Sequence, residues 1–301
     1  MPTIAYQSFN ANSSSTHGLA SISSQNFTRQ TNAHATGQGH QALVLPHISG
    51  HLTSPVEGPA HLRPVESLSG PQTVTTFGAQ VSLAFQNFYR SLGSMPDIMV
   101  VGELDTSHPD FTGMVGGTGV STTAHPSKKA CQSFTAISQN AVASGISFLD
   151  SGEGYVVYAV GALVVVFVHV PNRIATKSDQ TAQFYLDIAG SLGGKAKYID
   201  LIIGDTNQPS FNFSAQVLNQ AFNTNAYVNA SSQANVSRYD SWNVPAGGTN
   251  SVGTKVYDIA VYRSDINILR HSPVYISQSA GAVTVTDHCG LALSIERKSG
   301  T

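Results

Sequence analysis

The chain has few charged residues, and their two signs nearly cancel. Asp, Glu, Lys and Arg make up 11% of its 301 residues, and the formal net charge is −2. This balance gives no whole-molecule field that would attract a polyanion, so binding to nucleic acid would need a local patch or metal ions. Ser, Thr, Asn, Gln and Gly take the place of the missing charges, a composition typical of a β-rich globular protein with polar loops.

Cysteines and long apolar runs are also scarce. Cys131 and Cys289 are too few for a disulfide framework, and no Cys-x-x-Cys spacing indicates zinc. They fit buried free thiols better than a pair, and pairing stays open. The longest apolar run, Tyr155 to Val168, is interrupted by Gly161 and is too short to span a membrane. The N-terminus lacks the basic and apolar regions of a signal peptide, so we expect a soluble protein, with secretion after removal of a leader left open.

Composition changes sharply after the first few residues. A strand-like segment at 3–9 precedes a stretch at about 13–72 that is rich in Ser, Thr, His, Gly, Gln and Pro. Such a stretch predicts an insertion or irregular loop region, here inside one domain that spans 1–301. It could also bind a protein partner. Beyond it, apolar residues at helical spacing predict a helix over 78–93, and a buried strand follows at 98–101.

The middle of the chain has the pattern of a parallel sheet. Two β-branched strands flank Gly161 and the second ends at His169, a capped amphipathic helix follows at 178–194, and an apolar strand at 198–203 leads to Asp205. Strand, helix and strand in this order predict a crossover that joins parallel strands. Because parallel strands end on the same side of a sheet, His169 and Asp205 are expected at one edge. Further strands are expected within 255–264 and 281–296.

Several of these strands end, or are interrupted, at a carboxylate, a carboxamide or a histidine. Carboxylate and amide oxygens suit a hard divalent cation, and histidines suit acid–base chemistry. Plainer explanations stay open: the residues after the strand at 198–203 fit an Asx-rich turn, Asp258 fits an ion pair, and Asn12 competes with Asn10. Asp105, His108 and Asp110 fit a solvated loop. The polar positions at strand ends are Asn10, Glu103, His169, Asp205, Asn207, Asp258, Asp287 and His288.

In their order these motifs resemble the endonuclease/exonuclease/phosphatase superfamily, which includes deoxyribonuclease I. The matching stretches are FNAN, PDIMVVGE, VVFVHVPN, IIGDTN, YDIAVY and VTDHCGL, and the resemblance covers 3–12 and 78–296. The spacing from Glu103 to His169 is most similar to that of the B subunit of cytolethal distending toxins. The resemblance implies an α/β (α+β) fold, a four-layer α/β/β/α sandwich of two mixed β-sheets flanked by helices. Thr286 replaces the usual serine, and Asp105 replaces a DNA-contacting arginine of deoxyribonuclease I, which puts that contact in doubt.

The resemblance implies a metal site at the strand edge. Glu103 would hold the metal with Asn10, and Asp287 would add a further oxygen. The expected cofactor is Mg²⁺, with Mn²⁺ or Ca²⁺ as alternatives. Asn172 and Arg173, just after the histidine strand, are the expected substrate-binding residues.

The same resemblance assigns roles in hydrolysis. His288 would be the general base for water, held and polarised by Asp258. Asp205 and Asn207 would position water and a phosphate oxygen. His169 would donate to a phosphate oxygen or assist the leaving group.

The implied activity is metal-dependent hydrolysis of a phosphodiester, with DNA as the expected substrate and an endonuclease (DNase) as the expected enzyme. The toxin-like spacing and the absence of further domains favour this reading, and a toxin or effector delivered to its target is one origin it allows. The alternative is a phosphoinositide phosphatase or a sphingomyelinase-like lipid phosphodiesterase, for which the single tryptophan, Trp242, is weak support. A non-catalytic binding module of the same fold is the third reading. Oligomeric state is not indicated.

Overall fold

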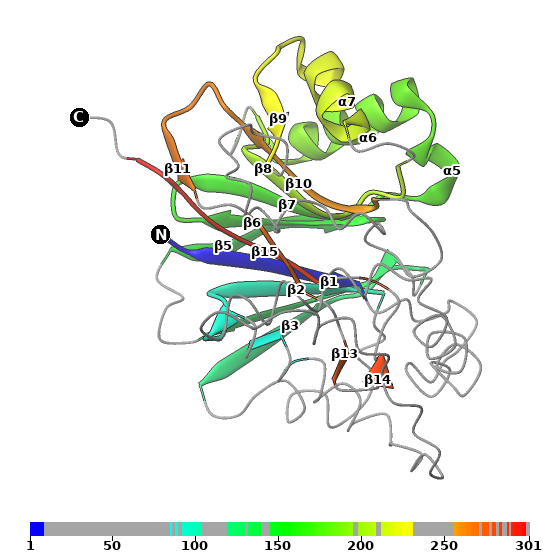
Figure 1. The fold of residues 1–301 in the computed structure, drawn as a ribbon. Coiled ribbons are helices and arrows are strands. Elements are labelled where there is room, and N and C mark those ends of the chain that lie inside the picture. The colour runs from blue at the N-terminus through cyan, green and yellow to red at the C-terminus, as the bar shows by residue number, and fades with distance from the viewer. Residues whose placement is uncertain are drawn as a thin grey trace, which may run out of the picture.

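Two β-sheets stack face to face in the computed structural model of the chain, and helices cover the outer side of one sheet (Figure 1). In the part of the chain that the structure describes, no helix has the length and apolar character needed to cross a membrane. The described residues are 1–8, 85, 88–89, 92–103, 119–129, 132–139, 145–194, 198–208, 212–230, 256–270, 273–276, 279–280, 283–284, 288 and 290–298.

The first sheet, which we call sheet A, joins the two ends of the described chain. Its strand order is β11-β15-β1-β2-β4-β3, and β12 also pairs with β15. Strand β1 runs parallel to β2 and antiparallel to β15, so it lies between an early and a late segment of the sequence. The strands are β1 (Thr3–Ser8), β2 (Ile98–Gly102), β3 (Val120–His125), β4 (Phe134–Gln139), β11 (Ile268–Arg270), β12 (Val274–Ile276) and β15 (Gly290–Arg297).

The second sheet, sheet B, is built from consecutive segments with one parallel crossover. Its strand order is β5-β6-β7-β8-β10-β9, and β7 and β8 are the parallel pair. This confirms the crossover expected from the sequence. The strands are β5 (Ile146–Gly152), β6 (Tyr155–Val160), β7 (Leu163–His169), β8 (Leu201–Asp205), β9 (Tyr227–Asn229) and β10 (Asp258–Arg263).

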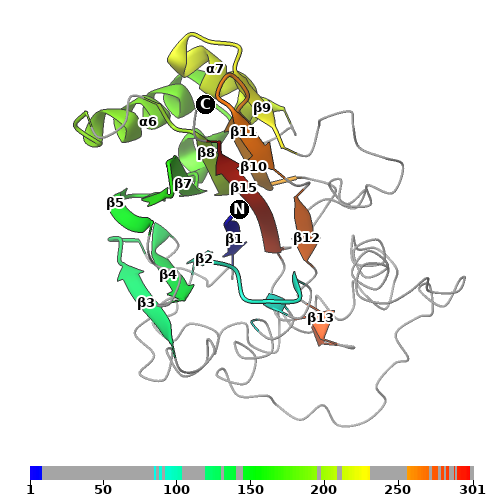
Figure 2. The same ribbon diagram turned by 90° about the vertical axis from the view of Figure 1, so that its left-hand side faces the viewer.

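Helices α5 (Asn172–Ala175), α6 (Ser178–Ser191) and α7 (Phe213–Phe222) cover the outer face of sheet B (Figures 1 and 2). On the far side, Phe85, Phe88, Tyr89 and Leu92 are helical, as the spacing over 78–93 predicts. A side-chain carbon added to Gly290 in β15 would lie 2.2 Å from the ring of Phe88, so this helical segment packs on sheet A. The order helix, sheet, sheet, helix is the expected four-layer sandwich. A short pair, β13 (Ser279–Ala280) and β14 (Val283–Thr284), lies apart from both sheets.

Alternation along the strands decides which side chains enter the space between the sheets. In β7, Leu163, Val165 and Phe167 join the core between the two sheets, whereas Val166 and Val168 pack under the helices. Strands β8 and β10 alternate in the same way, and every second residue of β1 and β2 joins the core between the sheets. Because successive side chains point to opposite faces, the next inward position after Phe167 is His169. The polar residues at these strand ends are therefore directed into the continuation of the core between the sheets.

Some elements lie outside what the sequence predicted. The sequence did not predict strands β3, β4, β5, β9, β11, β12 and β13 or helices α5 and α7, and the expected strand-rich segment 281–296 contains two separate strands, β14 and β15. The insertion at 13–72 lies outside the described residues, as do Cys131, Cys289 and Trp242, so the predictions made for them stay predictions.

Candidate active site

Three polar residues form a row at the ends of three neighbouring strands of sheet B. His169 at the end of β7 is paired in register with Asp205 at the end of β8, and Asp205 is paired with Asp258 at the start of β10. All three side chains are buried, with relative exposures of 3%, 2% and 0%. The row therefore closes one end of the core between the sheets, where the sequence predicted that His169 and Asp205 would meet.

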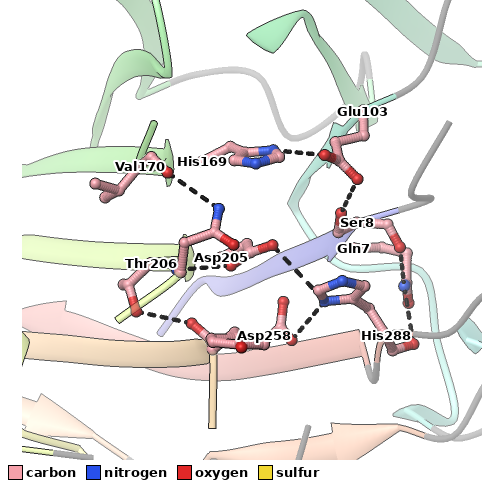
Figure 3. Close-up of polar contacts among 11 residues, drawn as sticks. Gln7, Ser8, Glu103, His169, Val170, Asp205, Thr206, Asp258 and His288 are labelled. Atoms are coloured by element: carbon pink, nitrogen blue, oxygen red, sulfur yellow. Dashed lines mark hydrogen bonds and ion pairs between the residues drawn. The ribbon is translucent and has the colours of Figure 1, made fainter. Parts of the chain in front are cut away.

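Sheet A faces this row with a second set of polar residues (Figure 3). Ser8 ends β1 and is paired in register with Gly102, the last residue of β2, and Glu103 follows directly. The Ser8 hydroxyl donates to Oε2 of Glu103 at 3.2 Å. Gln7 donates from Nε2 to the carbonyl oxygens of Ser8 and His288 at 2.7 and 3.3 Å, so it ties the end of β1 to the backbone of His288.

Glu103 connects the two sheets. Its Oε1 lies 3.3 Å from Nδ1 of His169, while its Oε2 accepts the hydrogen bond from Ser8. The alignment at Nδ1 of His169 is not that of a hydrogen bond, so the contact is an electrostatic one at the end of the core. Glu103 thus reaches from sheet A to His169 at the end of β7 in sheet B.

His288 and Asp258 form a buried hydrogen-bonded pair. Nδ1 of His288 lies 2.9 Å from Oδ2 of Asp258 and 3.8 Å from Oδ2 of Asp205. An ionised carboxylate accepts only, so Nδ1 is the donor and carries the proton. The hydrogen bond to Asp258 therefore fixes the tautomer in which Nε2 of the imidazole is free of a proton.

Asp205 and Asn207 are linked by a tight turn at the end of β8. The backbone N–H of Asn207 donates to Oδ1 of Asp205 at 2.8 Å, and its side-chain Nδ2 donates to the carbonyl of Val170 at 3.0 Å. The first contact is the Asx turn that composition alone favoured. The second holds the segment after His169 against β8, so Asn207 fixes two strand ends relative to each other.

Glu103 and Asn207 both have left-handed backbones, with φ of 55° and 51°. The left-handed region is unfavourable for residues that carry a β-carbon, and it costs about 1–2 kcal/mol per residue. Such residues gather at functional sites, where the surrounding structure holds them in place. Both lie directly after strands whose ends build this site.

Gly204 permits the close approach of β7 and β8 beside the row. Its φ is 148°, and a β-carbon added to it would lie 2.1 Å from the carbonyl oxygen of Val168. No other residue type fits there without separating the two strands. The glycine of the IIGDTN motif is therefore required by the spacing between His169 and Asp205.

Tyr6 lies beneath the carboxylates, on the same face of β1 as Ser8. Burial raises the pKa of its hydroxyl well above the usual value, and Asp205, Asp258 and Glu103 add to the rise through their negative charge. A β-carbon at Gly102 would lie 2.3 Å from this hydroxyl, so Gly102 leaves the room that Tyr6 needs. The tyrosine stays protonated and forms a neutral floor under the anionic cluster.

The charges of the cluster fit a bound cation. His169 lies beside Glu103, and His288 lies beside Asp205 and Asp258. Buried carboxylates are stable only where hydrogen bonds or positive charge balance them. A divalent metal ion with oxygen ligands would supply that balance.

Two locations for such an ion are open to the described side chains. Glu103 offers a carboxylate at the meeting point of the sheets, and single ligand atoms of Asp205, Asp258 and His288 lie within 4.8 Å of one another. In the second group Nδ1 of His288 already donates to Asp258, and a metal ligand at that atom would have to lose this proton. The hydrogen bond makes Glu103 the better centre for a metal.

The structure places the remaining sequence-predicted residues as follows. Asn172 and Arg173 are exposed in α5, directly after the segment that Asn207 holds. Asn10 and Asp287 lie outside the described residues. Ser8, Gln7 and Tyr6 were missed, because the FNAN motif directed attention to Asn10. Continuing the alternation of Ile4 and Tyr6 to Ser8 on one face of β1 could have found Tyr6 and Ser8, whereas Gln7 lies on the opposite face.

Neither a protein-family model nor a curated protein matches the sequence. Solved structures do match in fold. The mannosyl-6-phosphatase of Bacteroides thetaiotaomicron has a TM-score of 0.51 at 11% identity, over 98% of this chain and 100% of that one. A protein of unknown function from Enterococcus faecalis has a TM-score of 0.51 at 11% identity, over 74% of this chain and 93% of that one. This chain has the fold of the endonuclease/exonuclease/phosphatase superfamily.

Human Nocturnin, in a structure with bound sulfate, also matches, with a TM-score of 0.47 at 12% identity over 73% of this chain and 86% of that one. The likeness to the two structures with TM-scores of 0.51 establishes the deoxyribonuclease I-like fold and, at 11% identity, no activity. It confirms the two mixed sheets and flanking helices that the motifs implied. The closer similarity in spacing to the toxin subunit stays a prediction.

Proposed function

We propose that the protein is a divalent-metal-dependent phosphodiesterase that hydrolyses DNA as an endonuclease. The observation that supports it best is the pairing of His288 with Asp258 beside the buried carboxylates of Asp205 and Glu103. A histidine held in one tautomer and an anionic cluster suited to a cation are what metal-assisted attack of water on a phosphodiester needs.

His288 is the general base in this proposal. Its Nδ1–H is held by Asp258, so Nε2 can accept a proton from water. Asp258 is fully buried and stabilises the imidazolium that forms. Asp205 presents Oδ2 toward the same imidazole, while its Oδ1 is fixed by the backbone of Asn207. Asp205 thereby positions the attacking water.

His169 and Asn207 act at the neighbouring strand end. His169 faces the cluster from β7 and is held near Glu103, where as an imidazolium it would donate to a phosphate oxygen or to the leaving group. Asn207 fixes the separation between the ends of β7 and β8 through Val170. Its amide oxygen stays available to orient water.

Glu103 would hold the metal, with Asn10 and Asp287 as the further ligands that the motifs imply. When bound, the ion supplies Lewis acidity that offsets negative charge developing on the phosphoryl oxygens. Ser8 keeps the Glu103 carboxylate in place through its hydroxyl. Mg²⁺ is the proposed ion, because oxygen donors predominate among these residues.

DNA is proposed as the substrate because of the toxin-like spacing between Glu103 and His169. A phosphate monoester is the main competitor, since the mannosyl-6-phosphatase with this fold acts, by its name, on a phosphorylated sugar. One set of assays separates the two. Purified protein is given supercoiled plasmid, bis(p-nitrophenyl) phosphate as a minimal diester, and p-nitrophenyl phosphate as a minimal monoester, with and without Mg²⁺.

We expect Mg²⁺-dependent nicking of plasmid and hydrolysis of the diester. His288→Ala should lower both rates by about 10²–10⁴-fold, because it removes the base. Lys298→Ala, an exposed change just after β15, serves as the matched control and should leave both rates unchanged. Metal-replete protein that leaves plasmid and diester intact, or that prefers the monoester, would refute the proposal.

A further inference from the structure

Three charged side chains meet on the surface beside the site. One oxygen, Oε1 of Glu153, accepts a hydrogen bond from Nη2 of Arg173 at 3.0 Å and lies 3.5 Å from Nζ of Lys129. We call these three residues the rim cluster. The side chains of Arg173 and Lys129 are 60% and 59% exposed, so both cations remain open to solvent.

The rim cluster is attached to the backbone of two site residues. Glu153 lies in the turn between β5 and β6, and the carbonyl of the next residue, Gly154, accepts the N–H of His169 at 2.9 Å. On the other side, the Lys129 carbonyl accepts the N–H of Gln132. Ser133 follows Gln132 in the sequence, and its carbonyl accepts the N–H of Glu103 at 3.2 Å.

Close packing keeps the turn in this position. A β-carbon on Gly154 would lie 2.6 Å from the side-chain oxygen of Gln132 and 2.7 Å from the carbonyl of His169. Arg173 follows His169 by four residues and lies in α5, at the same end of sheet B (Figure 1). The turn that carries Glu153 is therefore a fixed neighbour of His169.

The charges of the rim cluster do not cancel. Two cations share one carboxylate, which leaves a local charge of +1 on a chain whose formal net charge is −2. Arg263, by contrast, is held by both oxygens of Asp265 at 2.9 and 2.7 Å and also faces Asp200. Lys128 and Lys177, which flank the cluster in sequence, are also exposed.

Glu153 can be replaced by a better anion. Exposed ion pairs contribute only about 0–1 kcal/mol, so separating Glu153 from its partners costs little. A phosphate offers several oxygens, and arginine binds phosphate through parallel hydrogen bonds while lysine acts as a point charge. Glu153 thus holds the two cations close together until a phosphate takes its place.

We propose that Lys129 and Arg173 form a subsite for a backbone phosphate that flanks the scissile one in a DNA strand, with Glu153 as the internal competitor for that subsite. The inference rests on the proposed function, because it names how the same site selects a polymer. A minimal diester carries one phosphate, which occupies the scissile position, and leaves the rim cluster unused. The cluster therefore favours DNA over a single phosphodiester.

The experiment compares Arg173→Ala, Lys129→Ala and Glu153→Gln with the Lys298→Ala control. Binding of a short fluorescein-labelled DNA duplex is followed by anisotropy from about 50 to about 200 mM salt, with Ca²⁺ in place of Mg²⁺ to slow cleavage. Hydrolysis of bis(p-nitrophenyl) phosphate in Mg²⁺ is measured in parallel. All four positions are exposed, so folding is expected to be retained, and circular dichroism verifies it.

Each alanine variant should lower the slope of log affinity against log salt by about 1 and weaken binding uniformly across DNA sequences. Glu153→Gln should tighten DNA binding at low salt, because it removes the competitor and keeps the side-chain shape. Hydrolysis of the minimal diester should be unchanged in Lys298→Ala and should fall by a smaller factor than DNA affinity in the two alanine variants of the cluster, since it needs no flanking contact.

Three results would overturn the inference: no change in the salt slope for Arg173→Ala and Lys129→Ala, weaker DNA binding by Glu153→Gln, or an equal loss on DNA and on the minimal diester. The inference would also be overturned, in favour of a lipid headgroup, if Arg173→Ala and Lys129→Ala weakened binding to phosphoinositide vesicles more than binding to DNA. Parent protein that fails to hydrolyse the diester would refute the proposed function instead. DNA binding reports on the rim cluster independently of that failure.

Discussion

Replacing Gly204 by alanine would place a methyl group inside the parallel pair of β7 and β8. The added carbon would lie 2.1 Å from the carbonyl oxygen and 2.9 Å from the nitrogen of Val168, and the residue would keep a φ of 148°. Val168 and Gly204 are paired in register, one position before His169 and Asp205. The two strands must therefore separate at the point where the active-site row begins.

Three costs set the size of the effect. Overpacking of a filled interior costs about 1–3 kcal/mol, a residue with a β-carbon in this backbone region costs a further 1–3 kcal/mol or so, and a weakened ladder hydrogen bond about 1 kcal/mol. We expect the free energy of unfolding to fall by about 3–7 kcal/mol, a large part of the roughly 5–15 kcal/mol that stabilises most domains. Hydrolysis should also fall, because Asp205 moves away from His169.

The assay is chemical unfolding followed by circular dichroism, with Gly190→Ala as the matched control. Gly190 is exposed in α6, and a β-carbon there would meet nothing within 4 Å. Alanine at that helical position should stabilise the protein by about 0.5–1 kcal/mol. Unfolding free energies of the two variants that agree within about 1 kcal/mol would refute the steric reasoning.

Three further predictions address the dyad, the metal and pH. Asp258→Asn should lower kcat by about 10³–10⁴-fold with little change in the Mg²⁺ requirement, because it favours the wrong tautomer of His288; a metal titration of activity checks both. Ser8→Ala should raise the Mg²⁺ concentration for half-maximal activity by about 10–100-fold, because Glu103 loses its donor, and an unchanged requirement would argue against this contact. Burial lowers the pKa of His125, whose Nε2 lies 2.7 Å from the hydroxyl of Tyr158, so its neutral form is favoured on folding. The contribution of neutral His125 to the free energy of unfolding is complete above its unfolded-state pKa of 6.5 and is lost as pH falls below that pKa. The free energy of unfolding, measured at pH 5 and pH 7.5, should therefore change less with pH in His125→Gln than in the parent protein, by at most about 1.4 kcal/mol per pH unit. An equal change in the two proteins would contradict this prediction.

The sequence predicted the parts of the site that follow from local pattern. An apolar strand, a capped helix and another apolar strand were enough to place His169 beside Asp205, and the register confirms the pair. The contact between His288 and Asp258 needed the family resemblance, because 30 residues separate them and no periodicity links β10 to the segment before β15. The four-layer arrangement of helices and sheets was also predicted from the family resemblance rather than from composition.

Other features depend on contacts between distant segments. Ser8 and Gln7 are polar residues at the end of β1, and their role is visible only once β2 and the backbone of His288 lie next to them. Strand β3, with the sequence VSTTAH and partly exposed positions, lacks the apolar alternation that marks a strand. Pairing with β4 makes it a strand, and pairing partners are not encoded locally.

The pairing of β1 with β15 has a consequence for synthesis. Thr3 is paired with Ser294 and Tyr6 with Leu291, so β1 leaves the ribosome long before β15 and waits for it before its antiparallel edge is covered. Contacts of such long separation in sequence slow folding, because the intervening loop must close first. His288 lies two residues before the start of β15, whereas Ser8 ends β1 and Glu103 follows β2. A nascent chain therefore carries Ser8 and Glu103 without His288 until β15 has been made and docks against β1.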